Sequence, residues 1–200
     1  MHGRIFRAFP IGPFTIIPEG ETATTGIPVF LGRKGAFGSG EHETTIACLE
    51  ELSMVDGISG STVLDLGSGT GILAIAAARL GAICTVALDN DLQAAISCSE
   101  NIILNALEKQ VITICGELAC LAANAFDLVL ANSYADLLLT LAADMVSITR
   151  PGGTLILSGI PIQDKFDVQL AFQRQGCILR DSRIGEEYVT FILRSPVYKD

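Results

Sequence analysis

The chain has 200 residues, of which 50% are hydrophobic and 18% are charged, and its formal net charge at pH 7 is -9. This length and composition suit one compact domain with a sizeable core rather than a disordered chain. The acidic balance and the lack of a Lys/Arg cluster argue against duplex nucleic acid as a partner, and no apolar run is long enough to cross a bilayer.

Residues 1–35 predict a short N-terminal extension that Pro and Gly interrupt repeatedly. One short strand is expected at Phe14–Ile17, and the charge and apolar pattern does not indicate a signal peptide. Six cysteines without a C-x-x-C pair, and only two histidines, predict no metal site. Free thiols and a cytoplasmic location are therefore expected, with Cys84 and Cys115 in the core.

Residues 36–200 predict a second region, a single α/β domain. Near-continuous apolar runs alternate with helical segments, which is typical of a parallel, doubly wound sheet covered on both faces. The expected strands are Thr62–Leu66, Thr85–Leu88, Val111–Ile114, Phe126–Leu130 and Thr154–Leu157. The expected helices are Glu43–Met54, Ile72–Leu80, Leu92–Leu107, Ala135–Ile148 and Asp164–Gln175. A last strand pair, Cys177–Arg180 and Val189–Leu193, is expected around a turn at Gly185.

A glycine-rich turn follows the first of these strands, with the sequence D-L-G-S-G-T-G-I at residues 65–72. A second acid, Asp89, ends the next strand about 20 residues later, as in a βαβ nucleotide-binding unit. An NAD-type fingerprint would place a glycine where Ile72 stands, and a pyrophosphate would meet the carboxylate of Asp65. A ligand with an ammonium group would instead gain an ion pair there. The turn therefore predicts S-adenosylmethionine as the cofactor, ahead of the alternative, an NAD(P)-dependent oxidoreductase.

Each residue of the turn then has an expected role. Asp65 is predicted to hold the cofactor ammonium, directly or through water, and Asp89 to accept both ribose hydroxyls. The backbone facing the methionyl and ribose parts is expected from Gly67, Ser68, Gly69 and Gly71. The alternative for Asp65 is a helix cap or turn residue, and for the glycines a tight connection between strand and helix.

Three further positions lie where parallel strands end, which is where open α/β sheets bind ligands. Asn90 follows Asp89 directly. Glu117 ends the third strand near the expected adenine position, although it could equally be a solvated loop acid. Asn132 follows the fourth strand and is predicted beside the transferring methyl group, as the catalytic candidate whose amide oxygen accepts from an amine nucleophile. Its alternative is a turn residue or helix N-cap before Ala135.

A second informative stretch, A-F-G-S-G-E-H-E-T-T at residues 36–45, precedes the first helix. Taken alone it suggests a loop that covers a ligand. Phe37 is expected either in the core or against the cofactor, and His42 is expected to be structural.

Together these stretches resemble the PrmA-type methyltransferases, which modify large-subunit ribosomal protein eleven. Their A-F-G-[ST]-G-x-H-x-T-T pattern is matched at residues 36–45, and their D-x-G-x-G-[ST]-G-[IV]-L-A-I-A-A pattern from residue 65 to 77. Their acidic second-strand end is matched at residues 89–91, and their P-G-G-x-L-x-x-S-G-I pattern at residues 151–160. Their V-A-N-x-[YL]-A pattern is approached at residues 130–135.

The resemblance implies a class I, Rossmann-like methyltransferase fold with a seven-stranded, mostly parallel sheet and helices on both faces. By position it carries cofactor contacts to Thr45, Gly67, Asp89 and Asn132. It implies N-methylation of a protein lysine or amino group. A nucleic-acid methyltransferase is disfavoured, because Asn132-Ser133-Tyr134 stands where such enzymes have an Asn-Pro-Pro-aromatic motif.

PrmA-type proteins also carry a separate N-terminal domain that captures the ribosomal protein, whereas only about 30 residues precede the matched region here. The catalytic half is therefore expected without the recognition half. A partner chain or a homo-oligomer is then one open possibility. Two alternatives are a small-molecule acceptor and a non-catalytic subunit that only binds S-adenosylmethionine.

Overall fold

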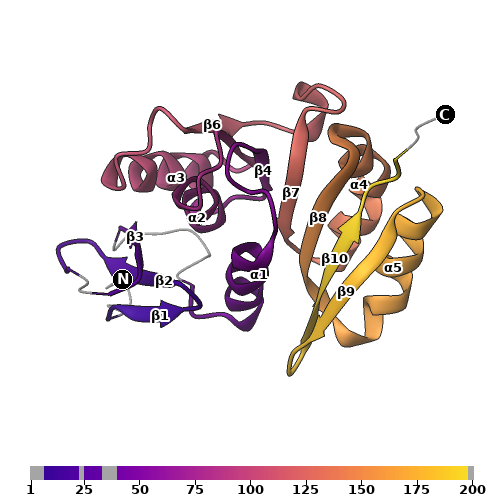
Figure 1. Ribbon diagram of the computed structural model, residues 1–200, viewed down its shortest axis with the longest axis horizontal. Coiled ribbons are helices and arrows are strands. Elements are labelled where there is room, and N and C mark those ends of the chain that lie inside the picture. The colour runs from indigo at the N-terminus through magenta and orange to yellow at the C-terminus, as the bar shows by residue number, and fades with distance from the viewer. Residues whose placement is uncertain (1–6, 23–24, 33–39, 198–200) are drawn as a thin grey trace.

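The computed structural model describes residues 7–22, 25–32 and 40–197, which form two β-sheets with helices around the larger one (Figure 1). The larger sheet has seven strands in the order β6-β5-β4-β7-β8-β10-β9. All neighbours from β6 to β8 pair in parallel, and β10 runs antiparallel to β8 and β9. These strands are β4 (Thr62–Leu66), β5 (Cys84–Asp89), β6 (Val111–Cys115), β7 (Phe126–Asn132), β8 (Thr149–Pro161), β9 (Ile178–Ile184) and β10 (Tyr188–Arg194). The prediction of a seven-stranded, mostly parallel sheet is confirmed.

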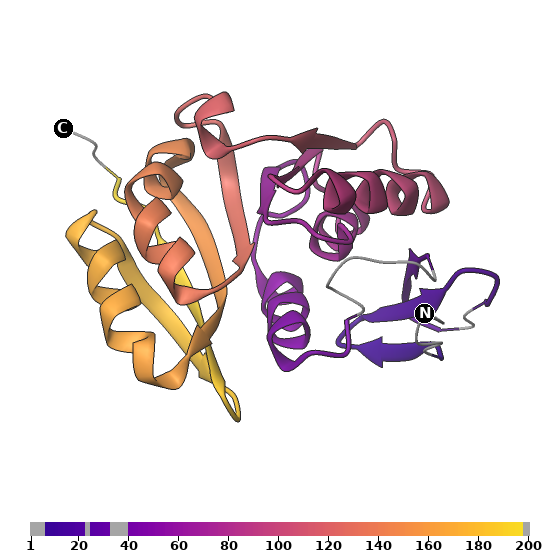
Figure 2. The same cartoon turned by 180° about the vertical axis from the view of Figure 1, so that it is seen from behind.

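Helices cover both faces of this sheet, and each face has its own hydrophobic core. Figure 2 shows α4 and α5 in front of the sheet, whereas α1, α2 and α3 lie on the other face. The helices are α1 (Glu43–Met54), α2 (Ile72–Arg79), α3 (Leu92–Leu104), α4 (Ala135–Ile148) and α5 (Lys165–Arg174), with two short 3-10 turns, η1 (Leu118–Cys120) and η2 (Ile162–Asp164). All five helices stand where the apolar spacing predicts them, within three residues at each end.

A small sheet of three strands precedes the main domain. Its strands are β1 (Phe9–Ile11), β2 (Phe14–Pro18) and β3 (Ile27–Leu31), with β2 in the centre. The predicted strand corresponds to β2, and β1 and β3 are additional. They are short segments between turns, which become strands only by pairing with β2. Phe14 and Ile16 join the core that packs against α1 and α2, so the small sheet is part of the same packed unit.

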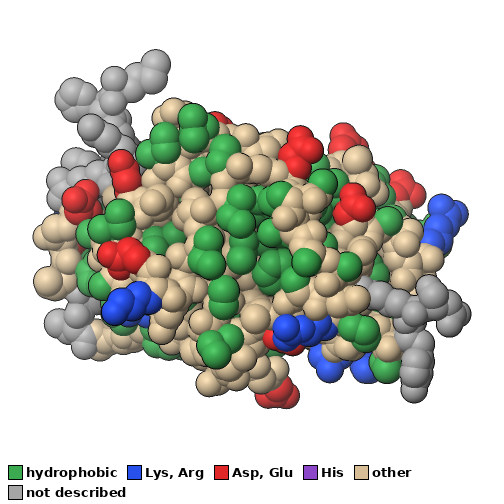
Figure 3. Space-filling model, turned by 90° about the horizontal axis from the view of Figure 1, so that it is seen from above, with side chains coloured by type: hydrophobic (Ala, Val, Ile, Leu, Met, Phe, Trp, Pro, Cys, Tyr) green, Lys and Arg blue, Asp and Glu red, His purple; other side chains and the backbone are tan. Residues whose placement is uncertain are grey.

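Of the two cysteines predicted in the core, Cys84 is half-buried and the prediction for Cys115 is wrong. Cys115 is exposed, because β6 is the edge strand of the large sheet and only the short turn η1 follows it. Ile112 of the same strand is 51% exposed. Apolar surface also remains elsewhere: seen from above, hydrophobic side chains gather in the middle of one face (Figure 3). Within the described ranges, no helix is both long and apolar enough to span a membrane.

Candidate functional site

The glycine turn connects β4 to α2 through three left-handed glycines. Gly67, Gly69 and Gly71 have φ angles of +71°, +52° and +78°. A Cβ on Gly67 would meet nothing within 4 Å, whereas a Cβ on Gly71 would lie 2.5 Å from Sγ of Cys98 on α3. Gly67 therefore offers its backbone to open space, and Gly71 is required by close packing of the turn on α3.

Asp65 lies beneath this turn and is only 1% exposed. Its Oδ2 accepts the backbone N–H of Ala74 at 3.0 Å, in the first turn of α2. Burial raises the pKa of Asp65 to about 7. In the structure Asp65 therefore caps α2, which was the alternative role predicted from the sequence. Its contact with a cofactor ammonium group stays a prediction. The Ser68 hydroxyl is also buried, so its side chain does not reach solvent and only its backbone is left for the predicted cofactor contact.

Asp89 ties the glycine turn to the start of α3. Its Oδ2 accepts the N–H of Gly69 at 2.9 Å, and its Oδ1 accepts the N–H of Asp91 at 3.0 Å. Asp91 in turn caps α3 by accepting the N–H of Gln93. The carboxylate of Asp89 is therefore held by two backbone donors at the carboxyl end of β5, and its contact with ribose hydroxyls stays a prediction.

A first cavity of about 250 Å³ opens beside Asp89. Asn90 and Glu117, both predicted from the sequence, line it together with Asp89 and Gly67. Gly116, which directly follows β6, lines it too. Its other lining residues are Leu66, Leu88, Leu118, Leu137 and Leu141. The structure therefore brings four of the predicted cofactor residues to one apolar cavity with a polar edge.

A second cavity of about 270 Å³ lies over the ends of β7 and β8. Its lining residues are His42, Thr44, Asn132, Ser133, Tyr134, Gly159 and Tyr188. Nδ2 of Asn132 donates to Oγ1 of Thr45 at 3.2 Å. Thr45 is 1% exposed, so in this structure it holds Asn132 rather than lining either cavity.

The wall of the second cavity joins the start of α1 to the β9–β10 hairpin. His42 caps α1, accepting the N–H of Thr44 at 3.4 Å, which agrees with its predicted structural role. Its ring also lies edge-on to that of Tyr188, with centroids 5.3 Å apart. Beneath them, Oγ of Ser158 is 2.6 Å from Oγ1 of Thr190 and bonds the carbonyl of Thr44 at 3.3 Å.

Sequence reasoning missed Tyr188 and Gly159. Tyr188 stands directly after the predicted polar turn, but nothing in the local pattern places that hairpin against α1. Gly159 belongs to the P-G-G-x-L-x-x-S-G-I match. Its φ is +79°, and a Cβ there would lie 2.5 Å from the carbonyl oxygen of Ser133, so only glycine fits this position without strain. Phe37 lies outside the described residues.

Two larger cavities, of about 480 and 440 Å³, lie at the opposite ends of the strands. They share Val55, Asp56, Thr154 and Arg194, and none of the predicted site residues lines either of them. Asp127 and Arg150, which line the larger one, form an ion pair. Five of the predicted site residues therefore line the first and second cavities, at the end of the sheet where α/β folds bind ligands: Gly67, Asp89, Asn90, Glu117 and Asn132. Thr45, Asp65, Ser68, Gly69 and Gly71 line neither of these two cavities.

Comparison with known proteins shows which family this chain is similar to. The family described as "Ribosomal protein L11 methyltransferase (PrmA)" matches residues 5–195. A relative of that name from Herpetosiphon aurantiacus is 36% identical over 207 residues, covering 92% of this chain and 64% of its own length. Another of that name, from Pelobacter propionicus, is 42% identical over 163 residues, covering 80% of this chain and 52% of its own. The chain thus spans between about half and two thirds of these curated relatives.

Solved structures show the same fold. A ribosomal protein L11 methylase from Lactobacillus delbrueckii subsp. bulgaricus superposes with a TM-score of 0.86 at 24% identity, covering 96% of this chain and all of that one. A structure described as an RNA methyltransferase from Pyrococcus horikoshii gives a TM-score of 0.66 at 16% identity, covering 80% of this chain and 87% of that one. Because the family match covers nearly the whole sequence, the chain belongs to the ribosomal protein L11 methyltransferase (PrmA) family.

Proposed function

We propose that this chain transfers a methyl group from S-adenosylmethionine to an amino group of a protein, with Asn132 orienting the acceptor. The observation that carries this proposal is the adjacency of the two cavities. Ala131 of β7 pairs with Leu66 of β4, and the next residue, Asn132, lines the second cavity, whereas Leu66 lines the first. A donor held over β4 and β5 and an acceptor held over β7 and β8 therefore meet beside Asn132.

The first cavity fits the adenosine part of S-adenosylmethionine. Its leucine side chains can bury an adenine ring, and the carboxylate of Asp89 can accept two ribose hydroxyls. The open space at Gly67 allows the backbone to approach the ligand. When bound, the cofactor supplies a methyl group already activated on a positively charged sulfur. We place its ammonium group near Asp65, through water, because that carboxylate is buried and bonded to α2.

The second cavity fits a neutral amine on an aliphatic chain. Rings of His42, Tyr134 and Tyr188 line it, and its lining among the described residues includes no Lys, Arg, Asp or Glu. A desolvated surrounding favours the neutral form of an amine, and a lysine must lose a proton from its ordinary pKa of about 10.4 before it can act as a nucleophile. With Nδ2 of Asn132 held by Thr45, Oδ1 is left to accept an N–H and direct the nitrogen lone pair.

The acceptor we infer is a lysine or terminal amine of a protein, and a ribosomal protein is the first candidate because of the family. Recognition by a partner chain or a second copy, and a cytoplasmic location, are part of the same proposal. A small-molecule acceptor and a non-catalytic binding subunit are the competing functions. The experiment below separates all three.

The test is to incubate the protein with a donor labelled on its methyl group and with large-subunit ribosomal proteins or free lysine amide. We expect label on a protein amine, located by mass spectrometry. At saturating donor, Asn132→Ala should lose at least about 100-fold in transfer, and Thr45→Val should lose less, because it only frees the Asn132 amide. Label on lysine amide alone, binding without transfer to any protein, or stabilisation by NAD rather than S-adenosylhomocysteine would each contradict the proposal.

A further inference from the structure

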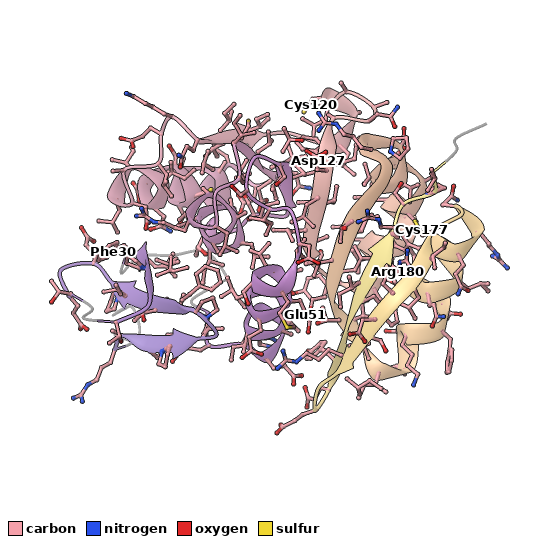
Figure 4. All side chains as sticks on the ribbon, in the orientation of Figure 1. Phe30, Glu51, Cys120, Asp127, Cys177 and Arg180 are labelled. Carbon is pink, nitrogen blue, oxygen red and sulfur yellow. The ribbon has the colours of Figure 1, made fainter. Side chains whose placement is uncertain are left out.

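Two asparagines at the C-terminal end of α3 bind the outer edge of the small sheet: Asn101 in its last turn and Asn105, its C-cap residue. β3 is an edge strand, and its Phe30 turns both backbone groups away from β2. Oδ1 of Asn105 accepts the N–H of Phe30 at 3.0 Å, and Nδ2 of Asn105 donates to the carbonyl of Phe30 at 2.7 Å. Oδ1 of Asn101 accepts the N–H of Gly32 at 2.7 Å. The two asparagines thus bond the backbone at the edge of β3 as a neighbouring strand would. Figure 4 labels Phe30, which lies below α3 in that view.

Asn101 makes one more contact that Asn105 does not. Its Nδ2 donates to the carbonyl oxygen of Thr70 at 2.9 Å, inside the glycine turn. Asn101 is 3% exposed, so both of its hydrogen bonds are shielded from water. One buried amide therefore joins the backbone of the small sheet to the backbone of the turn between Gly69 and Gly71.

The turn depends on such support. Its three glycines all have positive φ angles, and glycine loses more conformational freedom on ordering than any other residue. A carbonyl fixed at Thr70 limits the rotation of the peptide that joins it to Gly71. A turn that is already ordered binds a ligand more tightly, because less ordering remains to be done on binding.

We infer that Asn101 is a positioning residue through which the N-terminal sheet fixes the glycine turn and so sets the affinity for S-adenosyl ligands. This inference rests on the proposed cofactor site. It makes the small sheet part of the cofactor-binding apparatus, although no residue of that sheet lines the first cavity. Asn105 serves as the internal comparison, because its side chain holds the same sheet, bonds the carbonyl oxygen of Asn101 and accepts from Arg79, but makes no hydrogen bond to the turn.

The test compares Asn101→Ala with Asn105→Ala in the full chain. Both variants lose hydrogen bonds to β3 and should lower the melting temperature. Only Asn101→Ala should raise the dissociation constant of S-adenosylhomocysteine, by about tenfold, the effect of one buried hydrogen bond, while Asn105→Ala should stay within about twofold of wild type. A third variant, Asn101→Asp, keeps an acceptor for Gly32 but loses the donor to Thr70, and should show the same loss of affinity.

Hydrogen exchange without ligand provides a readout that does not need the cofactor. The amides of Gly69 and Gly71 should exchange faster in both Asn101 variants than in Asn105→Ala. Equal shifts of affinity and of exchange in Asn101→Ala and Asn105→Ala would overturn the inference. A wild-type protein that binds no S-adenosylhomocysteine would instead overturn the proposed function, and the exchange rates would still decide whether Asn101 orders the turn.

Discussion

Asp65 and Ala74 are joined by a buried hydrogen bond of 3.0 Å, so the acid that opens the glycine motif also holds the first turn of the helix that the motif begins. The Asp65 side chain is 1% exposed, and a carboxylate in that position is costly to ionise. The same residue therefore connects the stability of α2 with the charge at the floor of the cofactor site.

The first prediction concerns pH. Burial raises the pKa of Asp65 to about 7 in the folded chain, from an ordinary value of 3.8. Between pH 3.8 and about 7 the folded chain therefore keeps a proton on Asp65 that the unfolded chain releases. The free energy of unfolding that Asp65 contributes is fully present below pH 3.8 and is lost as pH rises to about 7. Denaturant titrations should show this loss in wild type and not in Asp65→Asn. Equal pH profiles of the two proteins would count against a raised pKa.

The same group should couple binding to pH. A ligand ammonium favours the ionised carboxylate, so S-adenosylhomocysteine should bind more tightly as pH rises from about 5.5 to about 8, with release of a proton. Calorimetry in buffers of different ionisation enthalpy measures that proton. Asp65→Asn keeps the titration of the ligand itself but removes that of Asp65. If wild type and Asp65→Asn release the same number of protons on binding, Asp65 does not contact the ligand ammonium group.

The second prediction compares two neighbouring carboxylates. Asp89→Ala removes the predicted acceptor of the ribose hydroxyls and the anchor of Gly69, and should weaken S-adenosylhomocysteine binding by about 10- to 100-fold. Asp91→Ala removes only the cap of α3 and should lower the free energy of unfolding by about 1 kcal/mol with little change in affinity. Calorimetric affinities that fall equally in both variants would indicate a general loss of structure at this end of β5.

The third prediction concerns packing under the glycine turn. In Gly71→Ala the new methyl group would approach Sγ of Cys98, and the residue would keep an unfavourable positive φ. The free energy of unfolding should fall by about 2 kcal/mol. Adding Cys98→Ala removes the steric conflict but not the backbone strain. The double variant should therefore be more stable, by about 1 kcal/mol, than the sum of the two single effects predicts. Strict additivity in a double-mutant cycle would show that the contact between the new methyl group and Sγ of Cys98 does not affect stability.

The fourth prediction separates the acceptor site from the cofactor site. Gly159→Ala would bring a Cβ against the carbonyl of Ser133, next to Asn132, and should reduce methyl transfer at least about tenfold while leaving the affinity for S-adenosylhomocysteine near wild type. Gly152→Ala is the matched control, because Gly152 has a φ of +71° but open space around its Cβ position. Comparable losses of transfer in both variants would point to backbone strain rather than to displacement of the acceptor pocket.

Much of the main domain could be predicted because its signals are local. Apolar runs between Thr62 and Leu157 mark the parallel strands, and helical spacing places α4 at its observed bounds, Ala135–Ile148. The small sheet is different: β1 and β3 are short and interrupted by Pro and Gly, so pairing across the sheet rather than propensity defines them.

The sequence by itself determined which residues stand at the strand ends: the spacing of Asp65, the glycines, Asp89 and Asn132 along a βαβ pattern requires them to meet at one edge of a parallel sheet. Only the tertiary structure decided what each one touches. It directed Asp65 into α2, joined Asn132 to Thr45 and brought Tyr188 beside His42. Those contacts link positions between 9 and 146 residues apart, and packing rather than local pattern fixes their approach.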